Sequence, residues 1–258
     1  MRKIILICFV IISLGLAGCD QTTGIGGTES IKPTAGTNDI AQINLKLGIA
    51  YLKTGEYAKS LTKLQKAQAA DPRYPPIYNT LGVLHQQLGD KVTAEKYFRQ
   101  ALSLNSSDAS TLNNYGQFLC QEARYDEAEE TFLKAVQNPL YLTPEIAFSN
   151  AGTCAMAQSR LDVAETYFRN ALEINPRVAV ALIQMSQISY KTASYLSARA
   201  YLQRYLEISP STAKSLWLGI RIERELGDKN TLSSYTLLLK NKFPDSKEAK
   251  LLKNSLAK

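Results

Sequence analysis

The sequence predicts an all-α, right-handed solenoid of six helix-turn-helix units, and the first observation behind this is a recurring glycine. Gly48, Gly82 and Gly116 are spaced by 34 residues, and Gly152 follows 36 residues later. The second observation is that small residues recur 12 and 19 positions after each glycine, with a leucine or phenylalanine at 16. Such a period is typical of repeat proteins. Because one helix pair cannot bury its apolar face alone, stacked units have to supply the core.

The period divides the main part of the chain into six units, with a two-residue insertion, Thr143-Pro144, after the third. The units are 41–74, 75–108, 109–142, 145–178, 179–212 and 213–246. Gly55, Gly89 and Gly227 begin turn signals between the two helices of their units. The lysine-rich residues 247–258 are expected to form a C-terminal capping helix. The pattern of small, aromatic and proline positions resembles the tetratricopeptide repeat.

The N-terminus has the features of an exported lipoprotein. Residues 1–18 form a signal peptide with a basic start and an apolar run that is too short to span a membrane comfortably. The run ends in Leu-Ala-Gly before Cys19, which resembles the bacterial lipobox and implies cleavage before Cys19 and lipidation of its sulfur. The alternative is an ordinary cleaved signal. Residues 19–40 are expected to be a lipid-anchored flexible linker, and Asp20 leaves retention in the inner membrane open.

The composition excludes several kinds of catalytic site. The chain has a single histidine, His85, so a zinc site built on two histidines is excluded, and we expect this side chain to pack in the core. No Walker motif and no nucleophile with a base and an orienting group can be assembled, so we expect no enzyme, metal site or cofactor. The formal net charge of +7 is spread along the chain, which argues against nucleic-acid binding. Four glutamates are expected to lie on a solvated face: Glu122, Glu127, Glu129 and Glu130.

Two cysteines fall at nearby positions in the first helices of adjacent units, Cys120 in the third and Cys154 in the fourth. We expect two buried free thiols at these positions. A disulfide bond is the alternative if the chain is exported to an oxidising compartment. The sequence does not fix the separation of the two Cα atoms, on which the bond depends.

The concave wall of the solenoid, lined by the first helix of each unit, is expected to bind a partner protein. At its N-terminal end, Leu45, Ile49 and Leu52 share one helix face that is separate from the expected core positions. They are the first candidates for a partner-binding groove. The alternative is that the linker or the N-terminal segment covers them. The middle of the wall is rich in amides, and the secondary candidates lie at its basic end: Trp217, Arg221 and Arg224.

Several local strings are more specific than the repeat pattern. They are NNYGQFLCQEARYDEA (113–128), SNAG (149–152), LWLGIRIERELGDK (216–229) and SSYTLLLKNKFPDSKEA (233–249). With the lipobox and the six units, they resemble the pilotin lipoproteins of type IV pili, called PilF or PilW. The resemblance implies a non-enzymatic protein at the periplasmic face of the outer membrane that binds subunits of the pilus secretin and promotes their localisation and multimerisation. The alternative is a generic periplasmic repeat lipoprotein that recruits envelope proteases or peptidoglycan enzymes. We expect a monomer.

Overall fold

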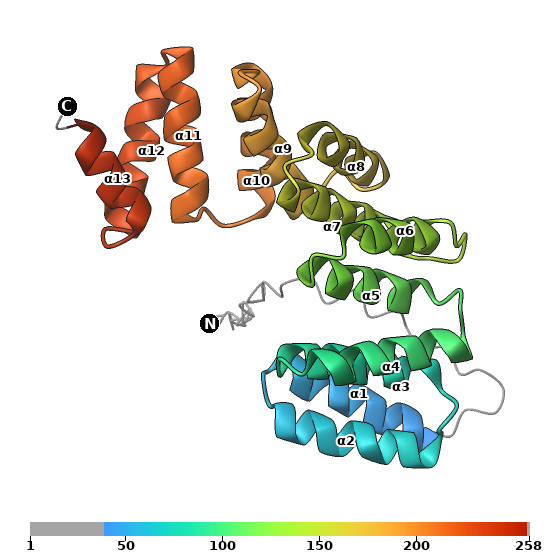
Figure 1. Ribbon diagram of the computed structural model, residues 1–258. Coiled ribbons are helices and arrows are strands. Elements are labelled where there is room, and N and C mark those ends of the chain that lie inside the picture. Colours follow the sequence, from blue (N-terminus) through green and yellow to red (C-terminus); the bar gives the residue numbers. More distant parts are fainter. Residues whose placement is uncertain (1–38, 257–258) are drawn as a thin grey trace, which may run out of the picture.

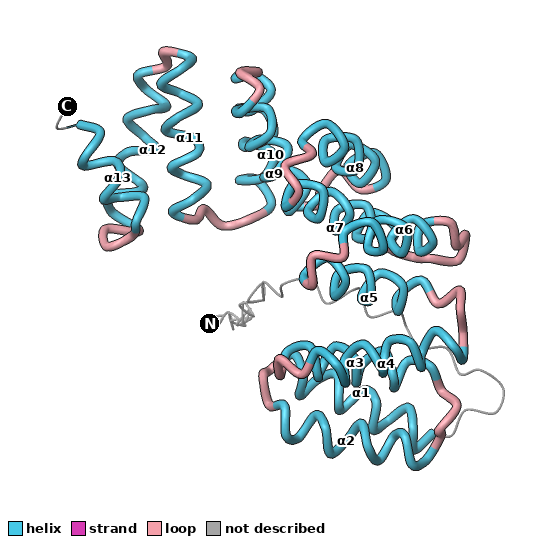
Figure 2. The backbone as a smooth tube through the Cα atoms, in the orientation of Figure 1, coloured by secondary structure: helices cyan, strands magenta, loops and turns pink. Residues whose placement is uncertain are grey.

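The computed structural model describes residues 39–256, and this range contains thirteen helices and no strand. The helices, in chain order, are α1 (Asp39–Lys53), α2 (Tyr57–Ala70), α3 (Pro75–Gln87), α4 (Lys91–Leu104), α5 (Ala109–Gln121), α6 (Tyr125–Val136), α7 (Pro144–Ala157), α8 (Leu161–Ile174), α9 (Ala179–Lys191), α10 (Tyr195–Ile208), α11 (Ala213–Leu226), α12 (Lys229–Lys242) and α13 (Lys247–Leu256). Short loops join them throughout, as Figure 2 shows.

Consecutive helices pair into six hairpins, from α1 with α2 to α11 with α12, and the hairpins stack into an open arc (Figure 1). Each hairpin contacts the hairpins next to it in the chain, and α13 packs against α11 and α12 at the C-terminal end. The all-α repeat solenoid that the glycine period predicts is therefore confirmed. A stack of this kind depends on contacts between neighbouring units, because no single unit encloses a core.

The N-terminal boundary of the solenoid differs slightly from the sequence prediction. Helix α1 begins at Asp39, so the last two residues of the expected linker are helical. An acidic residue in the first turn interacts favourably with the helix dipole, which is consistent with this start. The expected signal peptide 1–18, the lipidation site Cys19 and linker residues 20–38 lie outside the described residues. Between 39 and 256, no helix has the length and apolar character needed to cross a membrane.

The small and aromatic positions of the repeat meet inside the second, third, fourth and sixth hairpins. A Cβ atom added at Gly82 of α3 would lie 2.7 Å from Cδ1 of Phe98 on α4, and one at Gly116 would lie 2.8 Å from Cε1 of Phe132. The glycine therefore makes room for the aromatic ring that follows it by 16 residues. The alanines of the second helices are fully buried at these contacts: Ala94, Ala101, Ala128, Ala135, Ala164, Ala171 and Ala198.

We expect Ala164→Leu to lower the free energy of unfolding by about 1–3 kcal/mol, because the larger side chain overpacks a fully buried helix contact. The control is Ala200→Leu on the exposed face of α10, which should change the stability by no more than about 0.5 kcal/mol. Thermal unfolding followed by circular dichroism measures both. Equal melting temperatures for the two variants would contradict the tight packing of the helix contact at Ala164. The same loss is expected for leucine at three equivalent sites: Ala128, Ala135 and Ala171.

All six hairpin turns contain a residue in the left-handed backbone conformation. In three turns it is one of the glycines that mark the turn in the sequence: Gly55 (φ 74°), Gly89 (77°) and Gly227 (73°). In the other three it carries a side chain: Ala123 (φ 58°), Ser159 (60°) and Ala193 (57°). Glycine adopts this conformation without a steric penalty from Cβ, whereas other residues adopt it at a cost that the packed hairpin has to offset.

Ion pairs connect neighbouring hairpins on the side of the second helices. Nη1 of Arg124 lies 2.7 Å from Oε1 of Glu95, and Nη1 of Arg160 lies 2.9 Å from Oε2 of Glu129. Tyr167 donates a second hydrogen bond to Glu129, which lowers the pKa of that carboxyl. Burial and the same bond raise the pKa of Tyr167 to about 12. Glu129 therefore bridges two hairpins and is not part of a solvated face, which corrects the sequence expectation for this residue.

Candidate protein-binding surface

The first helices of the hairpins form the inner wall of the arc. Each of α1, α3, α5, α7 and α9 packs closely against the next first helix along the chain, whereas the backbones of the second helices in the described hairpins lie farther apart. Tyr167 of α8 still reaches Glu129 of α6 through its long side chain. In a curved stack, the helices that lie closer together are on the concave side. The concave wall therefore consists of α1, α3, α5, α7, α9 and α11, and it runs along the whole arc (Figure 1).

Side-chain amides join the first helices in the middle of the wall. Three pairs connect neighbouring units: Asn114 with Asn79 (N–O 3.0 Å), Asn150 with Asn113 (2.9 Å) and Gln86 with Gln121 (2.7 Å). Asn113 and Asn114 are buried at these contacts. Since each amide has a limited number of donors and acceptors, these pairs use part of the hydrogen-bonding capacity of the wall to hold α3, α5 and α7 together.

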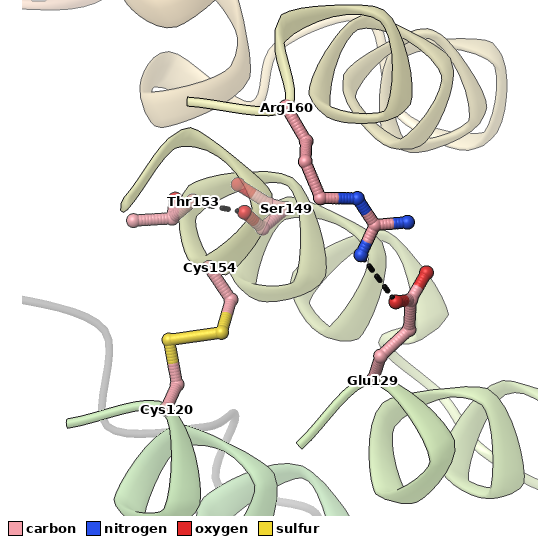
Figure 3. The surroundings of a disulfide bond; sticks show 6 residues. All are labelled: Cys120, Glu129, Ser149, Thr153, Cys154 and Arg160. Carbon is pink, nitrogen blue, oxygen red and sulfur yellow. Dashed lines mark hydrogen bonds and ion pairs between the residues drawn. A yellow bond between two sulfur atoms is a disulfide. The ribbon is translucent and has the colours of Figure 1, made fainter. Parts of the chain in front are cut away.

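A disulfide bond also joins two first helices. Cys120 near the end of α5 is bonded to Cys154 of α7, with the Cα atoms 5.8 Å apart (Figure 3). This separation lies within the range that disulfides require, about 4.4–6.8 Å. The expectation of two free thiols is therefore wrong, because α5 and α7 pack closely enough to bring the two cysteines together. The Arg160–Glu129 ion pair lies at the same junction (Figure 3).

The N-terminal candidates do not form an exposed groove. Leu45 and Leu52 are 0% and 5% exposed, and Ile49 is half-buried against the hydrophobic cluster that joins α1 to α2 and α3. The expected solvent-facing stripe is wrong for this reason: helical spacing shows which residues share a face, but not what packs on it. The exposed large apolar residues on this helix are instead Ile40, Ile43 and Leu47, at 59%, 57% and 39%. Serine at Leu45 would disturb the core and could not test partner binding.

The C-terminal candidates do lie together on one face of α11. The guanidinium group of Arg224 lies 5.6 Å from the centre of the Trp217 ring, and that of Arg221 lies 4.6 Å from the ring of Tyr190 on α9. Both distances fall within the range of cation–π attraction, about 6 Å. Nη2 of Arg224 also donates a hydrogen bond to Oγ of Ser255 on α13, at 2.8 Å. We call Tyr190, Trp217, Arg221 and Arg224 the basic–aromatic patch.

Sequence reasoning missed two residues that contact the arginines of α11, Tyr190 and Ser255. Tyr190 occupies the same repeat position in the fifth unit as Arg224 does in the sixth, so the repeat frame could have identified it. Ser255 has no such signal, because α13 follows the last repeat. The patch therefore spans two helices of the inner wall, α9 and α11, and Ser255 of α13 contacts it from the C-terminal end.

The basic–aromatic patch carries positive charge that the chain does not neutralise. Within the described residues, neither Arg221 nor Arg224 forms an ion pair, and neither do the exposed Lys191 and Lys214 on the same helices. Nε of Arg221 is buried and has no hydrogen-bond partner. Of the two carboxylates on α11, Glu223 is paired with Arg199 and Glu225 is exposed. The patch is thus suited to bind an anionic group.

The described part of the chain offers no metal-binding cluster. Among residues 39–256, no three His, Cys, Asp or Glu side chains gather where they could hold a metal ion. The ring of His85 lies 5.3 Å from that of Tyr97, and its Nδ1 lies 3.3 Å from Oδ2 of Asp90. His85 therefore has packing and hydrogen-bond partners within its own hairpin.

Family models of the tetratricopeptide repeat match most of the solenoid. One matches residues 39–107, and another matches residues 79–140 and 149–213. With the stacked hairpins and the continuous inner wall, these matches define a tetratricopeptide repeat protein.

Comparison with individual proteins narrows this class. The type IV pilus assembly protein PilF of Pseudomonas aeruginosa is 31% identical over 238 residues, which cover 92% of this chain and 93% of that protein. The solved structure of P. aeruginosa PilF matches with a TM-score of 0.78 and 31% identity over 85% of this chain and 99% of that one. The crystal structure of PilW, a widely conserved type IV pilus biogenesis factor, matches with a TM-score of 0.75 and 28% identity over 83% and 99%. The chain belongs to the PilF/PilW family of type IV pilus biogenesis proteins.

Proposed function

We propose that this chain is a non-enzymatic pilotin of the type IV pilus. In this proposal it is a monomer, anchored by a lipidated Cys19 at the periplasmic face of the outer membrane. It binds secretin subunits and promotes their outer-membrane localisation and multimerisation. The observation that carries the proposal is the relationship to PilF, which extends over 92% of the chain.

The shape of the solenoid supports a role in binding another protein. Its inner wall is continuous over six hairpins, and extended concave surfaces of this kind are what repeat proteins use to bind partners. We assign the partner contact to the basic–aromatic patch, which contains Trp217, Arg221 and Arg224. Leu45 and Leu52 are not part of this proposal, because both are buried.

The disulfide bond supports an extracytoplasmic location. Disulfides persist in oxidising compartments such as the bacterial periplasm and are rare in the cytosol. The Cys120–Cys154 bond is thus consistent with the signal peptide and lipobox that the sequence predicts. Stable anchoring to a membrane requires more than one acyl chain. Several acyl chains attached at Cys19 would therefore hold the solenoid at the membrane.

We expect Cys19→Ala to move the protein from the membrane fraction to the soluble periplasmic fraction and to abolish efficient formation of heat-resistant secretin multimers. Without the acceptor sulfur, no acyl chain can anchor the protein. Membrane fractionation and gel electrophoresis of heated envelopes measure the two effects. The matched control is Cys8→Ala, a cysteine replacement in the apolar run of the signal peptide, which should change neither result.

Two further outcomes of this experiment decide between proposals. Membrane attachment and normal secretin multimers in the Cys19→Ala strain would contradict the anchor and its role. Normal multimers together with lost recovery of envelope proteases or peptidoglycan enzymes would favour a generic scaffold instead.

In a separate test of sorting, Asp20→Ser should leave the protein in the outer membrane. A shift from the inner to the outer membrane would show that Asp20 acts as a retention signal.

A further inference from the structure

We infer that the basic–aromatic patch is a docking site for an acidic segment of the partner protein, bound through side-chain carboxylates at Arg221 and Arg224. The inference rests on the proposed function for the identity of the partner. The chemistry of the bound segment follows from the contacts of the patch.

The two arginines of the patch are held differently from many others in the solenoid. Five arginines are in ion pairs with carboxylates: Arg99, Arg124, Arg160, Arg169 and Arg199. Arg221 and Arg224 instead lie against the rings of Tyr190 and Trp217. Attraction to a ring restricts a guanidinium group while leaving its N–H donors available, and the planar fork of donors matches a carboxylate. The patch is therefore organised in advance for carboxylate binding.

Unsatisfied hydrogen-bonding capacity points to the same ligand. The side chain of Arg221 makes no hydrogen bond within the described residues, and its buried Nε has no partner. The Nη groups of the same guanidinium are not among the buried unpaired atoms, so they are the donors that a carboxylate can reach. Arg224 uses one N–H group on Ser255, which leaves the rest of its fork free.

The surrounding charge favours an anionic segment with more than one carboxylate. Lys191 and Lys214 add two positive charges without ion pairs on α9 and α11, while of the two carboxylates on α11 Glu223 is paired with Arg199 and Glu225 is exposed. Complementary charge of this kind increases the rate of encounter and selects the partner. Two separate arginines can engage two carboxylates, whereas a chain terminus supplies one. We therefore assign the ligand to Asp or Glu side chains within a segment rather than to a C-terminal carboxylate.

The position of the rings argues for a peptide rather than a nucleic acid. Proteins that bind single strands use open aromatic faces on which bases stack. At the patch, the chain's own guanidinium groups lie against Tyr190 and Trp217. The rings therefore serve to hold the arginines, and the arginines provide the contacts to the ligand.

The patch contains its own reporter, because Trp217 is the one tryptophan of the chain. The full-length protein in detergent is titrated with a short peptide of alternating glutamate and alanine that is acetylated and amidated at its ends. We expect a saturable change in tryptophan emission that weakens as salt is added. A glutamine–alanine peptide of the same length should give no change.

The double variant Arg221→Gln, Arg224→Gln should bind the glutamate peptide at least about tenfold more weakly, because charged hydrogen bonds are lost. The matched control is Arg73→Gln, Arg177→Gln, which removes the same charge from exposed loops and should bind as the parent does. If the first double variant has a lower melting temperature, Arg224→Gln alone carries the test, because this side chain is exposed.

Three results would overturn the inference. They are equal binding of the glutamine peptide, equal weakening by the control variant, and tighter binding of oligouridylate than of the glutamate peptide. The titration uses no secretin and no lipid anchor. It therefore succeeds or fails independently of the Cys19→Ala experiment, which tests the proposed function.

Discussion

Replacing Arg199 with methionine is expected to lower the free energy of unfolding by about 3–5 kcal/mol. The Glu223 side chain on α11 is only 1% exposed, and its carboxylate is paired with the guanidinium group of Arg199 on α10. Asp228, which caps the start of α12, is a second and more distant partner at 3.4 Å. Methionine keeps much of the aliphatic packing but removes the cation, so the buried carboxylate loses its charged partner.

Two comparisons separate this effect from a general loss of packing. Adding Glu223→Gln to Arg199→Met removes the buried charge and should recover a large part of the stability, because buried ion pairs contribute little net stability. Arg169→Met breaks the surface pair with Glu165 and should change the stability by no more than about 1 kcal/mol. Urea unfolding followed by circular dichroism measures all three variants. A loss for Arg199→Met no larger than that for Arg169→Met would contradict the role of the buried pair.

The period of the sequence was sufficient to predict the repeat fold, because the period reflects contacts that every unit repeats. Gly82 and Phe98 are 16 residues apart in the chain and meet in one hairpin, and Gly116 and Phe132 do the same. Such local pairs depend on helix geometry and on a short turn. They can therefore be identified without knowing how the hairpins stack.

Local sequence signals identified only some of the residues that adopt the left-handed turn conformation. Gly55 and Gly89 could be identified as turns because glycine is favoured in the left-handed conformation. Ala123, Ser159 and Ala193 adopt that conformation without any such preference. In these turns the packing of the hairpin determines the backbone, and only the repeat frame indicates the position.

Contacts between units were harder to predict than contacts within them. The repeat frame assigned Trp217, Arg221 and Arg224 to the first helix of the sixth unit, and in the structure Arg224 lies against Trp217 there. The shared helix face of Leu45 and Leu52 did not make them accessible, because both are buried in the cluster that joins α1 to its neighbours. Helical spacing identifies a face, but the structure is needed to show whether that face is covered.

Reducing the Cys120–Cys154 bond is expected to lower the free energy of unfolding by about 2–4 kcal/mol. The bond closes a loop between residues separated by 34 positions, and opening the loop increases the freedom of the unfolded chain. For a chain of this size, each kcal/mol of lost unfolding free energy lowers the melting temperature by about 2–4 °C. Thermal unfolding with and without a phosphine reductant measures the loss. The variant Cys120→Ser, Cys154→Ser should melt at the reduced temperature and should not respond to reductant.

Reduction should also change how the solenoid unfolds. The bond crosses from α5 to α7, and in a stack where units contact only their neighbours, a weakened junction reduces the coupling between the two sides. Trp217 lies in α11, so its emission reports on the C-terminal side alone, whereas circular dichroism reports on all helices. We expect the two transitions to coincide in the oxidised protein and to separate after reduction. Coincident transitions in both states, at an unchanged melting temperature, would mean that helix packing alone holds the third and fourth hairpins together.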